Sequence, residues 1–109
     1  MEELISKISD IVSAEQERGS QLHWKINHSD HESYAVIREE YEECLEELNN
    51  CEKHLNEFWS CVRNDCTEPE KLWALRSLSK SCYMLIAEAI QLCGVTEKAI
   101  NSICERGAV

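Results

Sequence analysis

The sequence predicts an all-α protein, a helical bundle of about four helices with one long central helix. Three observations favour this class. Apolar residues recur at steps of three and four along most of the chain, which is the period of amphipathic helices. No stretch alternates apolar and polar residues for long enough to form a strand. The single proline, Pro69, falls in the first turn of a predicted helix, where proline is favourable.

The first helix is predicted from the apolar positions within residues 4–12 and is expected to end near Gly19. The segment that follows, residues 20–29, has no helical period. Because it contains Trp24, and a tryptophan in a connection is usually packed, we expect an ordered connection here and not a flexible linker.

The central helix is expected to begin after a cap at Ser29 or Asp30 and to run to about Val62. Such a helix is longer than average for a globular domain, so its second half should face another helix or another subunit. We expect the remaining helices to pack on its apolar seam, which consists of Tyr34, Ile37, Tyr41, Cys44, Leu48, Cys51, Leu55, Phe58 and Val62.

Two helices are predicted after the central one. Thr67 caps the third helix, and Glu70 stands at the position that completes a capping box. Gly94 is expected to end this helix, because glycine is the usual residue just after a helix. Thr96 is then expected to cap a short fourth helix.

The composition limits the classes of function. The 109 residues are predicted to form one domain, residues 1–109, whose small size favours a homo-oligomer. A net charge of −10 argues against direct nucleic-acid binding and against binding to anionic membranes. No apolar run approaches the roughly 20 residues of a membrane span, and the start of the chain lacks the pattern of a secretion signal. We therefore expect a cytoplasmic protein.

The seven cysteines are an odd number and include no Cys-x-x-Cys pair, which argues against a disulfide framework. Several fall on predicted apolar helix faces, where cysteine is a small core residue. Two pairs have spacings that could supply metal ligands, His28 with His31 and Cys61 with Cys66, but neither spacing is specific for zinc.

The glutamates of the central helix fall into two groups. One group lies on the flank of the apolar seam and consists of Glu40, Glu43 and Glu47. The other points away from the seam, is expected to be solvated, and consists of Glu39, Glu42 and Glu46. Like charges on one flank repel each other, and a bound divalent cation would remove that repulsion.

Glu88 lies on the flank of the third helix, among aliphatic residues. If it faces Glu40 and Glu43, carboxylates from two helices form a cage for one or two divalent cations, for which Mg²⁺ or Mn²⁺ suits oxygen ligands best. The alternative is a boundary glutamate at the edge of the bundle, which is a common position for this residue type.

Several short motifs together resemble the phage-type branch of the MazG-like all-α nucleoside triphosphate pyrophosphohydrolases. The resemblance covers about residues 11 to 95 and rests on the segments 15–18, 35–43 and 87–91. It implies Mg²⁺-dependent cleavage of a nucleoside triphosphate to the monophosphate and pyrophosphate by a helical dimer or tetramer. By position, it makes Glu40 and Glu43 catalytic metal ligands and adds Glu88 as a ligand from the third helix.

The chain departs from this family at Gln91, which occupies the place of an aspartate ligand and whose amide would bind a cation more weakly. Candidates for substrate contacts are Lys25 and Arg38 for phosphate and Trp24 for the base. Two functions remain open. One is the enzyme; the other is a non-catalytic acidic helical protein of phage type that sequesters nucleotides or binds and inhibits a host protein.

Overall fold

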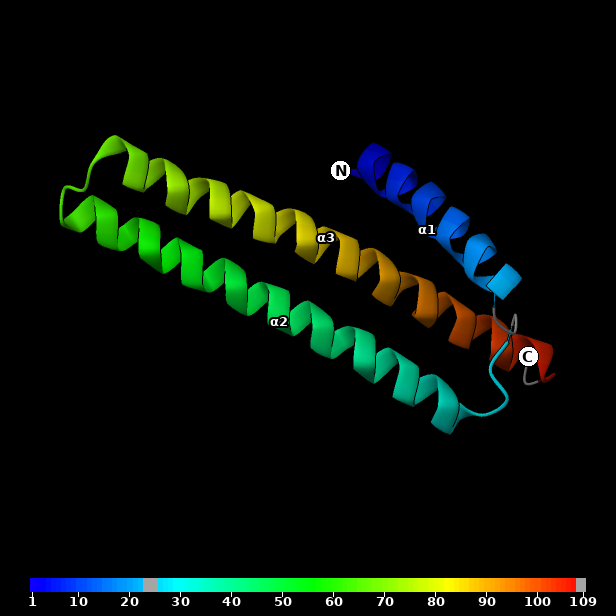
Figure 1. The fold of residues 1–109 in the computed structure, drawn as a ribbon. Coiled ribbons are helices and arrows are strands. Elements are labelled where there is room, and N and C mark those ends of the chain that lie inside the picture. Colours follow the sequence, from blue (N-terminus) through cyan, green and yellow to red (C-terminus); the bar gives the residue numbers. More distant parts are fainter. Residues whose placement is uncertain (23–25, 108–109) are drawn as a thin grey trace. The chain divides into compact units, whose positions relative to one another are not determined.

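The computed structural model describes residues 1–22 and 26–107. Within these residues the chain folds into three helices, α1 (Glu2–Leu22), α2 (Asp30–Arg63) and α3 (Glu68–Glu105), and contains no strand (Figure 1). The predicted all-α class is confirmed. None of these helices has the length and apolar character needed to cross a membrane.

The prediction of a fourth helix is wrong, because α3 continues through Gly94 without a break. Glycine inside a helix costs about 1 kcal/mol relative to alanine, which weakens a long helix but does not end it. The hydroxyl of Thr96 donates to the carbonyl of Leu92 at 2.8 Å and so forms a bond within the helix, not a cap. With 38 residues, α3 exceeds the 34 of α2, so the described fold has two long helices instead of one central helix.

The predicted helix starts agree with the structure. The hydroxyl of Ser29 accepts a hydrogen bond from the backbone N–H of Glu32 at 3.1 Å, which makes Ser29 the cap of α2. The hydroxyl of Thr67 accepts from the N–H of Glu70 at 3.4 Å and also donates to its carboxylate at 3.1 Å. The first bond is the predicted cap, and the second joins the two side chains, whereas in a full capping box the glutamate accepts from the backbone N–H of the cap residue.

The chain divides into two compact parts, of which the first is the hairpin unit, Glu43–Glu88. It contains the second half of α2 and the first half of α3, which run antiparallel (Figure 1). The turn between them has a helix-ending motif in which the N–H of Cys66 donates to the carbonyl of Cys61 at 3.0 Å. Asp65 adopts a positive φ of 51° and completes this turn.

The second part, the three-helix unit, comprises Met1–Glu42 and Ala89–Val109. Asn27 follows α1, is 2% exposed, and forms hydrogen bonds with residues of α2 and α3 in this unit. The N–H of Asn27 donates to the hydroxyl of Ser102 at 2.7 Å, and its side-chain amide donates to Ser33 at 2.9 Å. Arg106 donates to the carbonyl of Asn27 and forms an ion pair with Asp30. This network ties the start of α2 to the end of α3.

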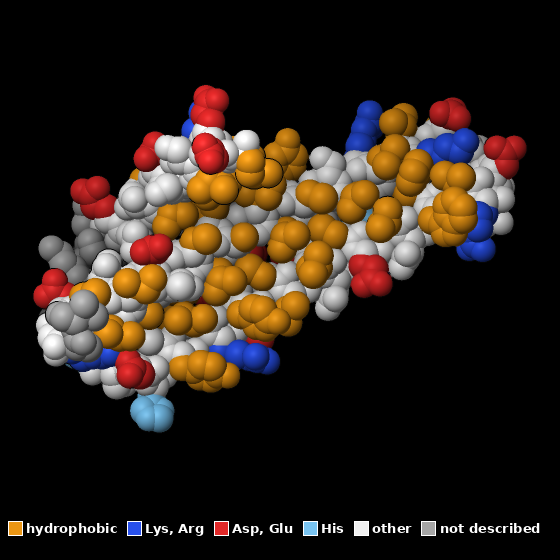
Figure 2. Space-filling view, turned by 180° about the vertical axis from the view of Figure 1, so that it is seen from behind, with side chains coloured by type: hydrophobic (Ala, Val, Ile, Leu, Met, Phe, Trp, Pro, Cys, Tyr) orange, Lys and Arg blue, Asp and Glu red, His pale blue; other side chains and the backbone are white. Residues whose placement is uncertain are grey.

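Few apolar side chains are buried in the single chain. Among the described residues, those with less than a tenth of their surface exposed are Val12 and Ala74. Leu48 and Leu55 of the apolar seam are 51% and 53% exposed, and Trp73 is 61% exposed. Rows of apolar side chains are accordingly visible at the surface (Figure 2). The other helices thus leave much of the seam uncovered, contrary to the prediction.

We expect Ser102→Ala to lower the free energy of unfolding by about 1 to 3 kcal/mol, because the buried N–H of Asn27 would lose its acceptor. Urea unfolding followed by circular dichroism measures this loss. Ser79→Ala, at an exposed position of the same helix, is the control and should change stability by less than about 0.5 kcal/mol. Equal effects of the two substitutions would contradict the importance of the Asn27 network.

Candidate functional site

Polar residues line the side of α2 that faces α3 in the hairpin unit. They recur at steps of four and three and are all half-buried: Glu43, Glu47, Asn50, His54, Glu57 and Cys61. The facing side of α3 has the same spacing and carries Glu70, Ala74, Ser77, Ser81, Met84 and Glu88. Ala74 and Ser81 are 1% and 8% exposed. Small side chains at a crossing let two helices approach closely, so the polar residues are partly shielded from water.

Glu43 and Glu88 face each other across this polar contact between α2 and α3. A carboxylate oxygen of each lies within 4.8 Å of the other, and both side chains are half-buried. Burial raises the pKa of Glu88 above its ordinary value, and a hydrogen bond with Glu43 raises it further. The negative charges of Glu43, Glu47 and Glu46 act in the same direction. These effects all favour the protonated form of the Glu88 carboxyl.

Glu40 lies on the turn of α2 that leads into the hairpin unit, three residues before Glu43. Residues three apart on a helix are neighbours on one side of it. Glu40 itself belongs to the three-helix unit and is half-buried. Glu40, Glu43 and Glu88 are the three glutamates that the sequence predicts as metal ligands.

The donor set suits a small, hard divalent cation. Mg²⁺ binds oxygen ligands at about 2.0 to 2.1 Å in octahedral geometry, so ligand oxygens on one ion are about 3 to 4 Å apart. Oxygens that already lie within 4.8 Å of each other reach this spacing with small side-chain rotations. A divalent cation would offset the repulsion between the charges of Glu43 and Glu88.

A cavity of about 420 Å³ adjoins the pair within the hairpin unit. Its wall includes Glu47, one turn after Glu43, and Met84, one turn before Glu88. The other lining residues are mostly hydrogen-bond donors: Asn50, His54, Ser77, Lys80 and Ser81. The cavity therefore combines an acidic end with a wall of donors, one of which is a lysine.

Gln91, the predicted fourth metal ligand, forms a different contact. Its amide donates to the carboxylate of Glu15 at 3.2 Å within the three-helix unit. The same carboxylate accepts from Arg18 at 2.8 Å, and Arg18 first and Gln91 second hold the pKa of Glu15 below its ordinary value. Gln91 thus links α3 to α1 at the surface.

The predicted substrate residues are not gathered at the carboxylates in the described structure. Arg38 is exposed, forms an ion pair with Glu42 at 2.9 Å, and has its guanidinium 5.4 Å from the ring centre of Tyr41. The predictions for Trp24 and Lys25 fall outside the described residues. The structure instead identifies Lys80, which lines the cavity, as a positively charged side chain near the carboxylates.

Sequence reasoning missed Lys80 and its serine neighbours as candidate binding residues. A signal was present, because Ser77, Ser81 and Glu88 follow one another at helical steps on the same side of α3. These donors lie two and three turns before Glu88, outside the acidic motifs. The cavity becomes apparent only when α2 supplies the opposite wall.

Comparison with known proteins gives no relative for this chain. No family model matches it, and neither a curated protein nor a solved structure shows significant similarity. The candidate site therefore rests on the geometry of the hairpin unit and on the sequence motifs.

We expect the contribution of Glu88 to the stability of the metal-free protein to fall as pH rises above the ordinary glutamate value of 4.5. The pKa of Glu88 is raised in the folded state, so the unfolded chain loses this proton first. The stability contributed by the proton is present below 4.5 and is lost as pH rises through the folded pKa. Glu88→Gln should remove this component, because glutamine resembles the protonated acid.

Urea unfolding at about pH 5 and about pH 7 tests the sign of this effect. The control is Glu39→Gln, an exposed glutamate of α2 that should retain the pH dependence of the parent. The assignment to Glu88 fails if Glu88→Gln and the parent lose the same stability over this pH interval.

Proposed function

We propose that this protein is a Mg²⁺-dependent nucleoside triphosphate pyrophosphohydrolase that converts an NTP or dNTP to the monophosphate and pyrophosphate. The observation that carries the proposal is the meeting of Glu43 and Glu88 from separate helices, with Glu40 one turn away on α2. Helical bundles typically build divalent-metal sites from such inward carboxylates. The resemblance of the acidic motifs to the MazG-like enzymes is a second support.

In this proposal Glu40, Glu43 and Glu88 hold Mg²⁺ or Mn²⁺. The bound cation would neutralise triphosphate oxygens and lower the pKa of a water molecule. The half-buried position of the carboxylates increases their value as ligands, because charges attract more strongly where water is partly excluded. The same burial disfavours the site when it has three charges and no cation.

In this proposal the nucleoside triphosphate binds in the cavity beside the carboxylates. Lys80 pairs with phosphate oxygens, and Ser77 and Ser81 donate hydrogen bonds to them. Glu47 stands at the acidic end and serves as the general base. Water attacks the α-phosphorus, the bond from that phosphorus to the bridging oxygen breaks, and pyrophosphate leaves. The proton of the attacking water passes to Glu47.

The proposal includes assembly of this chain with further copies of itself. The exposed seam residues Leu48 and Leu55 of α2 and the exposed Trp73 of α3 support this partner. A second copy would supply an apolar surface of the same kind, as isologous interfaces do. The inner side of the hairpin unit is polar. Self-association would therefore stabilise the protein mainly by burying the apolar side chains on the outer side of this unit.

A second candidate is a non-catalytic acidic helical protein that sequesters nucleotides or binds and inhibits a host protein. The exposed apolar side chains favour it, because large exposed apolar areas mark protein-binding surfaces. The net charge of −10 would attract a basic partner. In both candidates the protein acts in the cytoplasm, in a phage or prophage context, and does not bind nucleic acid directly.

We expect the protein to release pyrophosphate from at least one member of a panel of nucleoside triphosphates when Mg²⁺ is present. Glu43→Gln should lower kcat by about 100-fold or more, because a metal ligand is lost. Glu39→Gln, an exposed glutamate that points away from the site, is the matched control and should retain activity. Absence of turnover on every substrate, or an active Glu43→Gln, would exclude the enzyme and leave the binder.

We expect a dimer or tetramer in solution, measured by light scattering coupled to size-exclusion chromatography. Leu48→Asp and Leu55→Asp should each raise the dissociation constant by at least about 100-fold, because a charge would be buried without a partner. Asn49→Asp introduces the same charge at an exposed polar position between them and should leave the assembly unchanged. A monomeric parent chain would rule out the self-association.

A further inference from the structure

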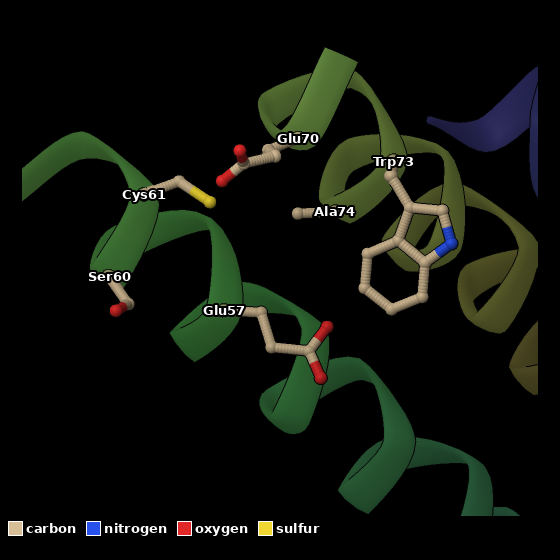
Figure 3. A pocket seen from close by; sticks show the side chains of 6 residues that line it. All are labelled: Glu57, Ser60, Cys61, Glu70, Trp73 and Ala74. Carbon is tan, nitrogen blue, oxygen red and sulfur yellow. The ribbon is translucent and has the colours of Figure 1, made fainter. Parts of the chain in front are cut away.

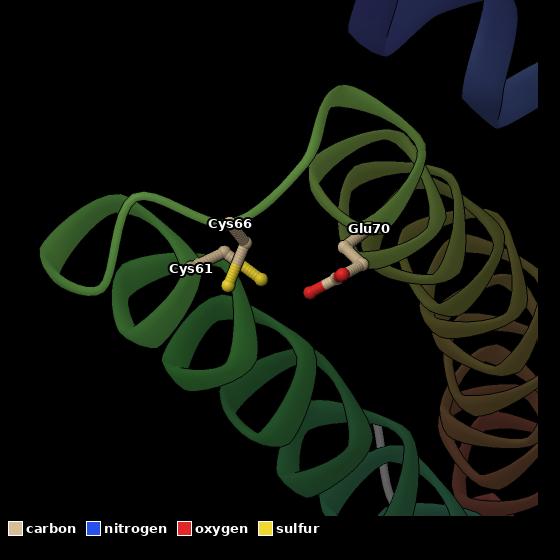
Figure 4. A group of neighbouring side chains, drawn as sticks. All are labelled: Cys61, Cys66 and Glu70. Carbon is tan, nitrogen blue, oxygen red and sulfur yellow. The ribbon is translucent and has the colours of Figure 1, made fainter.

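A second group of ligand-type side chains lies at the turn end of the hairpin unit, apart from the carboxylate pair. It consists of Cys61 near the end of α2, Cys66 in the turn and Glu70 in the first turn of α3 (Figure 4). One ligand atom of each lies within 4.8 Å of the other two. The two thiols and the carboxylate point toward a common point in Figure 4.

The backbone of the turn creates this group. The positive φ of Asp65 reverses the chain, and the N–H of Cys66 then bonds to the carbonyl of Cys61 at 3.0 Å. Cys66 is thereby brought back to Cys61 just after the end of α2 at Arg63. The capping pair at Thr67 and Glu70 orients the carboxylate, since the Thr67 hydroxyl donates to it at 3.1 Å.

We infer that Cys61, Cys66 and Glu70 form a zinc site with two thiolates, one carboxylate and an open fourth position. Zinc prefers sulfur ligands at about 2.3 Å in tetrahedral geometry, which separates two thiolates on one ion by about 3.8 Å. The observed limit of 4.8 Å between ligand atoms is close to this separation. Mg²⁺ is not suited to the group, because it prefers oxygen donors only.

The site has access and room for an ion. Cys61 and Glu70 line a cavity of about 350 Å³ whose other walls are Glu57, Ser60, Trp73 and Ala74 (Figure 3). Each cysteine is only half-buried, and Glu70 is exposed. An ion can therefore enter from solvent and keep a water molecule in the fourth position.

The groups that act on the Cys66 thiol are a second thiol and a carboxylate. A hydrogen bond with Cys61, together with burial and the nearby Glu70, raises the pKa of Cys66 to about 11. A cation among the ligands would reverse this effect, because metal binding favours the thiolate. The Thr67 hydroxyl would then act as an outer-shell partner that fixes the Glu70 ligand.

Zinc at this position would tie α2 to α3 across the turn. Because the ion is bound only when the turn is folded, its binding free energy adds to the stability of the hairpin. Such a cross-link would be an important source of stability for the hairpin unit, because the inner side of this unit is polar. The site is independent of the proposed hydrolase activity, since it shares no residue with the carboxylate pair.

The test is titration of the reduced, full-length chain with Co²⁺, a spectroscopic substitute for zinc. We expect one thiolate-bound ion per chain, with a thiolate-to-metal charge-transfer band, ligand-field bands of tetrahedral intensity, and loss of the charge-transfer band when Zn²⁺ is added. Cys61→Ser and Cys66→Ser should each weaken the band and lower Zn²⁺ affinity by at least about 100-fold. Glu70→Gln should retain the charge-transfer band but lower affinity by about 10- to 100-fold.

Three controls make the outcome decisive. Cys93→Ser removes an exposed cysteine elsewhere on α3, and Glu57→Gln alters the same cavity without removing a ligand. Both should bind Co²⁺ like the parent, as should Glu43→Gln, which disables only the proposed Mg²⁺ site. The zinc site is refuted if the reduced parent shows no thiolate band. It is also refuted if both serine variants keep the charge-transfer band at the intensity of the parent. Formation of a disulfide between the two thiols in reducing buffer, with Zn²⁺ present, would refute it as well.

Discussion

The structure of the hairpin unit depends on one constraint, which is that the facing sides of the antiparallel helices α2 and α3 are polar. The side of α2 that faces α3 carries glutamate, asparagine and histidine at regular helical spacing, and small residues such as Ala74 and Ser81 face it. The helices can approach because the α3 side is small. Acidic groups are therefore held in a partly shielded space, where an uncompensated charge is unfavourable and a cation or a proton is favourable.

The same constraint explains why the single chain has so little apolar core. A helix can turn only one side toward a given neighbour, so the polar flank of α2 toward α3 directs residues such as Leu48 and Leu55 outward. Apolar burial is the dominant favourable term in folding. The hairpin unit thus has a polar interior that suits a site and an apolar exterior that suits a partner.

The three-helix unit is stabilised in a different way. Its centre is a hydrogen-bonded group around Asn27 and Ser102, both almost completely buried. Buried polar groups of this kind specify one arrangement, because any other arrangement would leave a donor without an acceptor. The Gln91 contact with Glu15 adds a surface link between α1 and α3. Gln91 thus has a structural contact whether or not the chain hydrolyses nucleotides.

The sequence by itself determined the all-α class and the cap at Thr67, and it limited the cap of α2 to Ser29 or Asp30, because each depends on spacing along one helix. It also named Glu40, Glu43 and Glu88 as metal ligands, which stays a prediction. It could not determine that α3 passes through Gly94, since a small local penalty is outweighed by a long helix and its contacts. The cavity with Lys80 and the meeting of Cys61, Cys66 and Glu70 were decided only by the tertiary structure. These groups depend on which side of α2 faces α3 and on how the turn reverses the chain, and helical periodicity does not contain that information.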